Sequence, residues 1–150
     1  MADSAQDLIT SGTICLEAKR YEEALALFVQ VCTLAPRDPE ANYGKATALW
    51  RLERHEEALA ACETGLNVAS SFSRLWYRKG AVLEDLGSPR EALLAFAEAI
   101  RHDPSDSWPW YGKGNGHDRL GEHREALEAF EQAIALDPGD AYPWNGKGNA

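Results

Sequence analysis

A period of 34 residues runs through this chain of 150 residues and limits its possible folds more than any other feature. The nonapeptides "WPWYGKGNG", from residue 108, and "YPWNGKGNA", from residue 142, start 34 residues apart and agree at six positions. Alanines, lysines and tryptophans recur at the same spacing: Ala24, Ala58, Ala92 and Ala126; Lys45, Lys79, Lys113 and Lys147; Trp76, Trp110 and Trp144. A repeat this regular indicates one structural unit copied along the chain.

Each unit has the pattern of two helices. In "HREALEAFEQAIAL", residues 123–136, apolar side chains recur three and four positions apart and form one helical face. Leu-Gly pairs at 86–87 and 120–121 predict turns between helices, and Asp-Pro predicts the end of each second helix. Asp38, Asp106 and Asp140 stand where helix N-caps are expected. The units are therefore helical hairpins, which bury their apolar faces by stacking.

The order of residues within the unit resembles the tetratricopeptide repeat, with Trp early, Gly four positions later, Ala and an aromatic residue midway, and Asp-Pro at the end. The resemblance implies an all-α fold, a right-handed superhelical solenoid of antiparallel helix pairs, as a single domain over 1–150. The repeats are 5–38, 39–72, 73–106 and 107–140, with a partial fifth at 141–150. The second repeat departs from the pattern, since Asn42, Cys62 and Ser70 take the Trp, aromatic and Pro places.

The partial fifth repeat predicts that this chain is a piece of a longer repeat protein, because a solenoid normally ends in a helix with a polar outer face. The alternative is self-association through the uncapped C-terminal end.

The recurrent glycines and lysines favour packing over phosphate binding. A phosphate-binding loop lies between a strand and a helix, whereas no strand precedes these glycines and no Ser or Thr follows Lys113. Gly114 takes the place where paired helices approach closely. Gly112 and Gly116 lack such a reason, although each costs ~1 kcal/mol against Ala inside a helix. The resemblance implies that the lysine stems lie along the packed seam, with their ammonium groups reaching water. The alternative is a row of lysines that binds a polyanion.

Composition excludes several classes of partner. The formal charge of −9 without a basic cluster argues against nucleic acid and against an anionic membrane surface. No apolar run approaches ~18 residues, so no membrane insertion is expected. The start "MADSAQDLIT" lacks a secretory signal, and the three cysteines are widely spaced. These features favour a reducing, cytoplasmic location.

The chain shows no catalytic constellation, metal-ligand pattern or cofactor motif, so we do not expect an enzyme. His117 and His123 offer no recognisable ligand spacing, and His117 is expected to be half-buried and hydrogen-bonded. The pair Glu22 and Glu23 opens a second helix, where acidic residues favour the helix dipole.

The family resemblance implies that the first helices of the repeats line a concave groove for a peptide or helix of a partner protein. Carried over place by place, the predicted partner-binding residues are Tyr43, Trp50, Arg51, Arg74, Tyr77, Arg78, Trp108, Tyr111, Asn115, Arg119 and Tyr142. Aromatic residues and arginine dominate binding energy at interfaces. The alternative is that these aromatic side chains only extend packing between repeats.

Chaperone-binding members of the family hold C-terminal carboxylates with a five-residue clamp. Its places are taken here by Ile9, Thr13, Gly44, Arg74 and Arg78. Only the two arginines can hold an anion, so a chaperone-tail receptor is not expected. One turn apart on a helix, the two could still bind a single carboxylate.

The sequence therefore predicts a protein–protein interaction scaffold. The alternative function is an oligomerisation or assembly segment of a larger multidomain protein, such as an enzyme whose catalytic domain lies outside this chain.

Overall fold

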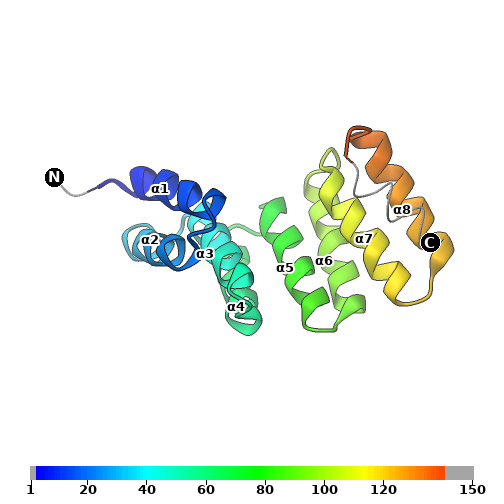
Figure 1. Cartoon of the computed structure of the whole chain (residues 1–150), viewed down its shortest axis with the longest axis horizontal. Helices are drawn as coiled ribbons and strands as arrows, with labels where there is room; N and C mark the ends of the chain where they lie inside the picture. The colour runs from blue at the N-terminus through cyan, green and yellow to red at the C-terminus, as the bar shows by residue number, and fades with distance from the viewer. Residues whose placement is uncertain (1–2, 141–150) are drawn as a thin grey trace.

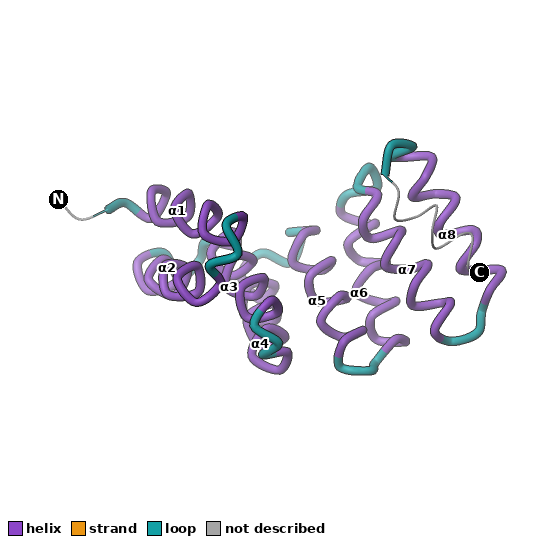
Figure 2. The backbone as a smooth tube through the Cα atoms, viewed as in Figure 1, coloured by secondary structure: helices purple, strands orange, loops and turns teal. Residues whose placement is uncertain are grey.

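Eight α-helices make up the described part of the chain, residues 3–140 of a computed structural model (Figures 1 and 2). They are α1 Ala5–Glu17, α2 Tyr21–Leu34, α3 Pro39–Arg51, α4 His55–Val68, α5 Ser73–Asp85, α6 Pro89–His102, α7 Ser107–Arg119 and α8 His123–Leu136. No strand occurs among these residues. The all-α fold predicted from the period is confirmed, while the partial fifth repeat, with Tyr142, lies outside the described residues.

The helix ends follow the local signals in the sequence. The Asp38 side chain accepts a hydrogen bond from the backbone N–H of Glu40, at 2.9 Å, and Asp106 accepts one from that of Trp108, at 3.0 Å. Both carboxylates thereby satisfy N–H groups that have no partner inside the helix. The chain's first helix begins with a capping box, in which Ser4 and Asp7 bind each other's backbone N–H.

The helices form two layers with different contacts. Each helix packs on the next along the chain, and the odd-numbered helices also contact one another, α1 with α3, α3 with α5 and α5 with α7. No two even-numbered helices among residues 3–140 contact each other in this way. The odd-numbered helices are therefore the inner layer of a curved solenoid and the even-numbered helices the outer layer.

Phenylalanines of the outer layer explain five of the glycines inside helices. Phe28, Phe96 and Phe130 are almost fully buried. A Cβ on Gly80, in the same repeat as Phe96, would lie 2.5 Å from the Phe96 ring. A Cβ on Gly112, in the next repeat, would lie equally close. Phe28 and Phe96 thus each need a glycine on both sides, which supplies the reason for Gly112 that the sequence alone does not show.

Gly116 has a separate packing reason. A Cβ at this position would lie 2.9 Å from Cδ2 of Leu93 on α6. The glycine therefore lets α7 approach α6 at a second point, one turn beyond Gly112.

In the second repeat the phenylalanine and the two glycines beside it are all replaced together. Cys62 stands where the other repeats have Phe, and Ala46 stands where they have Gly in the same repeat. In the following repeat Arg78 takes the place of Gly44 and Gly112. The smaller Cys62 side chain leaves room for larger neighbours, so Arg78 is buried at this junction, with 7% of its surface exposed.

Candidate functional site

One pocket on the inner layer spans three successive repeats and has a volume of about 420 Å³. We call it the inner pocket. Helices α3 and α5 supply three residues each, and the start of α7 supplies the rest. Its lining residues are Tyr43, Trp50, Arg51, Arg74, Tyr77, Arg78, Asp106 and Trp108. All except Asp106 belong to the set that the sequence predicted for partner binding.

Arg78 occupies the middle of this aromatic surface. Its guanidinium carbon lies 4.4 Å from the ring centroid of Trp50 and 5.6 Å from those of Tyr43 and Tyr77. Such contacts stabilise a cation most when it is withdrawn from water. Nη2 donates to the Tyr43 hydroxyl at 3.5 Å, whereas the buried Nε has no hydrogen-bond partner among residues 3–140. The Arg78 guanidinium is therefore stabilised by cation–π contacts with aromatic rings more than by acidic side chains.

Arg74, one turn earlier on α5, already has an acidic partner. It forms an ion pair with Glu40 on α3, and its guanidinium carbon lies 4.9 Å from the Tyr43 centroid and 5.0 Å from that of Phe72. The two arginines therefore differ in how far their charge is compensated. Their joint binding of a carboxylate stays a prediction.

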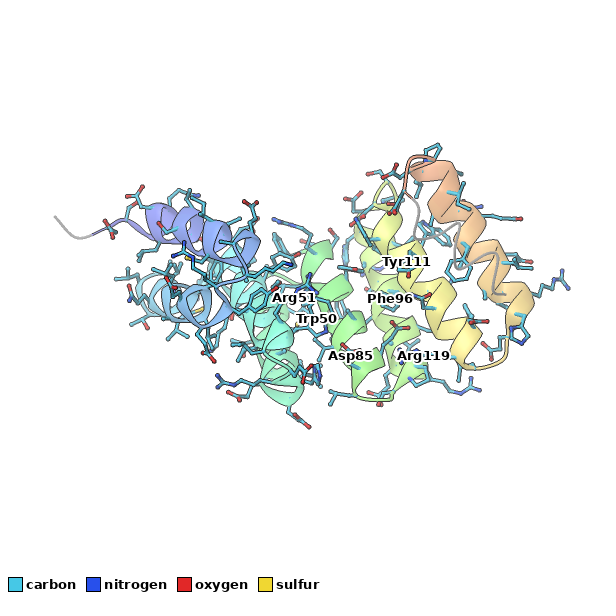
Figure 3. All side chains as sticks on the ribbon, viewed as in Figure 1. Trp50, Arg51, Asp85, Phe96, Tyr111 and Arg119 are labelled. Atoms are coloured by element: carbon cyan, nitrogen blue, oxygen red, sulfur yellow. The ribbon has the colours of Figure 1, made fainter. Side chains whose placement is uncertain are left out.

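Trp50 lines the inner pocket and links two of its helices. Its indole Nε1 donates to Oδ2 of Asp85 at 2.5 Å, which joins α3 to α5, and the two side chains lie side by side in Figure 3. Arg51 lies over the same indole ring, 4.7 Å from its centroid. This charge-assisted hydrogen bond fixes the ring that contacts both Arg51 and Arg78.

Part of the aromatic set also packs the core, as the alternative interpretation expected. Tyr77 lies 6.0 Å from Phe96 between ring centroids, and Tyr111 lies 5.9 Å from Phe130. Burial raises the pKa of the Tyr77 hydroxyl to about 12. Trp108 is different, because it is 42% exposed and meets Tyr111 edge to face at 6.1 Å. It is the aromatic side chain of the pocket most accessible to a partner.

The remaining predicted residues lie beyond the inner pocket. Arg119, at the end of α7, donates from Nη1 to the backbone carbonyl of Glu84 at 3.0 Å. Asn115 follows Tyr111 by one turn of α7, and Tyr142 lies outside the described residues. Asp106 was expected only as an N-cap, and its burial raises the pKa of its carboxyl above the usual range. Its place in the pocket follows from the junction of α7 with α5, which no local pattern shows.

Sequence models of the tetratricopeptide repeat match residues 16–79, 73–116 and 107–140. The chain belongs to the tetratricopeptide repeat family. The resemblance proposed from the 34-residue unit is thus confirmed, and the pair α3 and α4 belongs to the family although its repeat departs most from the pattern.

Several solved structures of tetratricopeptide repeat proteins share the fold. TTC0263, a thermophilic tetratricopeptide repeat protein of Thermus thermophilus, is 22% identical over 97% of this chain and 80% of its own, with a TM-score of 0.88. A structure of MamA from Desulfovibrio magneticus RS-1 is 26% identical over 99% and 84%, with a TM-score of 0.82. YrrB, described as having an unusual peptide-binding site, is 22% identical over 97% and 75%, with a TM-score of 0.79. A search of curated proteins gave no significant match.

The titratable groups of this tetratricopeptide repeat chain show no metal site within residues 3–140, because no three His, Cys, Asp or Glu side chains converge there. His117 is half-buried and its Nδ1 lies 2.7 Å from Oε2 of Glu122, the hydrogen-bonded state expected for it. Burial raises the pKa of the Cys62 thiol to about 12, which keeps it from acting as a thiolate near neutral pH.

Within residues 3–140, no helix has the length and apolarity needed to span a bilayer.

Proposed function

We propose that this chain is an interaction scaffold whose inner pocket binds a peptide or helical segment of a partner protein. The tetratricopeptide repeat fold supports the scaffold role. The observation that carries the finer proposal is the convergence of seven predicted residues, from two successive repeats and the start of a third, on one pocket of about 420 Å³. That volume lies in the ~300–1,000 Å³ range of ligand pockets. YrrB, with its peptide-binding site, is a protein of the same fold, which supports the choice of a peptide as ligand.

The residue types suit an extended or helical segment that contacts several repeats at once. Aromatic side chains and arginine supply most of the energy at protein interfaces. The exposed Trp108 ring offers an apolar contact, and Arg51 and Arg78 lie along the same wall. Because Glu40 already neutralises Arg74, we expect the partner to place one acidic side chain near Arg51 and Arg78, beside an apolar one on Trp108.

The test is a selection of peptides from a random display library on the whole chain, followed by titration of each selected peptide. The double change Trp108→Ala and Arg51→Ala should weaken binding at least tenfold, since loss of one such anchor costs about 2 kcal/mol. A matched control is Leu94→Ala with Arg90→Ala, which removes an apolar and a basic side chain from the outer layer. Peptides that bind the inner-pocket double variant as tightly as the original chain would refute the proposal.

The assembly-segment alternative and the cytoplasmic location remain predictions. The first depended on the C-terminal end, beyond Asp140, which lies outside the described residues.

A further inference from the structure

Arginine side chains and aromatic rings alternate along the inner pocket. The guanidinium carbon of Arg74 lies 4.9 Å from the Tyr43 centroid, and that of Arg78 lies 5.6 Å from the same ring. Around the next ring, Trp50, Arg78 lies 4.4 Å and Arg51 lies 4.7 Å from the centroid. Each of the two rings therefore contacts two cations. We call these five side chains the arginine ladder.

Acidic side chains compensate the Arg74 end of the arginine ladder. Arg74 forms an ion pair with Glu40 on α3. On the other side of the inner pocket, burial raises the pKa of the Asp106 carboxyl, and the charge of Arg74 opposes that rise. Two carboxylates of the chain itself therefore interact with Arg74.

Arg78, in the middle of the arginine ladder, has no acidic partner. It is 7% exposed, it forms no ion pair within residues 3–140, and its buried Nε has no hydrogen-bond partner there. A buried charge is costly unless an opposite charge accompanies it. An acidic group of a ligand therefore has more to gain at Arg78 than at Arg74.

The ion pair between Glu40 and Arg74 contributes little to folding. The two side chains are 41% and 47% exposed, so water screens their attraction. The pair nevertheless keeps a negative charge beside an arginine that lines the inner pocket. A second acidic group of a ligand, one position along the arginine ladder from Arg78, would meet that charge instead of a free guanidinium.

We propose that Glu40 is a specificity-determining residue of the inner pocket, which occupies Arg74 in place of a ligand carboxylate. The pocket then accepts a partner segment with one acidic side chain, placed at Arg78, and disfavours a segment with two. This inference rests on the proposed function, because it concerns the ligand of the same pocket. Like charges brought together at an interface suppress binding of the wrong partners.

The first experiment selects peptides from one random display library on three whole chains: the original, Glu40→Gln and Glu63→Gln. Glu63 is the matched control, because it also pairs with a cation of α5, Lys79 at 3.3 Å, but outside the inner pocket. We expect peptides with one acidic residue from the original and from Glu63→Gln, and peptides with two from Glu40→Gln. The two-acid peptides should bind Glu40→Gln about fivefold more tightly than the original chain.

The outcomes separate this inference from the proposed function. Peptides that need the inner pocket, but carry the same number of acidic residues whichever chain selected them, refute the role of Glu40 alone. An equal gain with Glu63→Gln also refutes it, because the effect is then one of net charge. If no selected peptide loses affinity with the double change Trp108→Ala and Arg51→Ala, the proposed function and this inference both fall.

The second experiment tests whether the effect of Glu40 passes through Arg74, by a double-mutant cycle. Adding Arg74→Gln to Glu40→Gln should remove the fivefold gain of the two-acid peptides. In the original chain, Arg74→Gln should change the affinity of one-acid peptides by about twofold or less, since Arg74 is already compensated. A gain that persists without Arg74, or a loss of one-acid peptides as large as that gain, contradicts the assignment.

Discussion

Replacement of Cys62 by phenylalanine gives the second repeat the residue that the other three have, yet we expect it to destabilise the chain. At the junctions of Phe28 and Phe96 the ring fits because glycine stands on both sides; a Cβ at Gly80 or Gly112 would already lie 2.5 Å from the Phe96 ring. At this junction Ala46 has a Cβ and Arg78 has a whole buried side chain. Overpacking of a core costs ~1–3 kcal/mol. With both flanks filled, we expect Cys62→Phe to lower the free energy of unfolding by about 3 kcal/mol.

The compensating changes make the reasoning testable. Ala46→Gly and Arg78→Gly should each destabilise the original chain, since Gly costs ~1 kcal/mol against other residues in a helix. Combined with Cys62→Phe, they recreate the arrangement of the other junctions. The free energy of unfolding of the triple variant should therefore exceed, by at least ~2 kcal/mol, the value obtained by adding the three single effects.

Urea unfolding followed by circular dichroism, over all eight combinations of the three changes, gives this coupling energy directly. Independent sites add within about 0.5 kcal/mol. If the three changes add to that precision, the ring does not compete with Ala46 and Arg78 for one space, and the account of this junction is wrong.

Three further changes follow from the same structure. Gly112→Ala should lower the free energy of unfolding by about 1–2 kcal/mol, because overpacking against Phe96 outweighs the better helix propensity of Ala. The control Asn115→Ala on the same helix should not lower it, and urea unfolding measures both variants. Burial raises the pKa of the Glu84 carboxyl from 4.5 to about 7, so this group ionises at lower pH in the unfolded chain than in the folded one. The free energy of unfolding should therefore fall by up to about 3 kcal/mol as the pH rises from 4.5 to 7. Glu84→Gln should remove this pH dependence when unfolding is measured at pH 5 and pH 8. In native protein a thiol reagent should modify Cys32, which is half-buried, well before Cys62, and equal rates would contradict the burial of Cys62.

The helices could be predicted because their signals are local and repeated. Apolar spacing in 123–136 defines α8, and Asp38 and Asp106 cap the helices that follow them. The repeat register also fixes which side of each first helix faces inward, which is why seven predicted residues meet in the inner pocket.

The features that could not be predicted depend on contacts between repeats. Within its own repeat Cys62 is only a departure from the pattern, although Ala46 and Arg78 change with it. Comparison of the places on both sides of each phenylalanine would have found this set. Glu40 and Arg74 hold the same place in successive repeats, 34 residues apart, so comparison across the period would also have found their ion pair.

The unequal contacts of the two layers have a mechanical consequence. Within residues 3–140 the backbones of neighbouring outer helices do not approach one another as those of the inner helices do, so we expect resistance to bending to come mainly from the inner helices and from the contacts between consecutive helices. A change of curvature separates the outer helices while it keeps most inner-layer contacts, so it should need less energy than sliding one repeat past the next. We therefore expect a partner that changes the curvature of the inner layer to change the spacing of the outer helices as well.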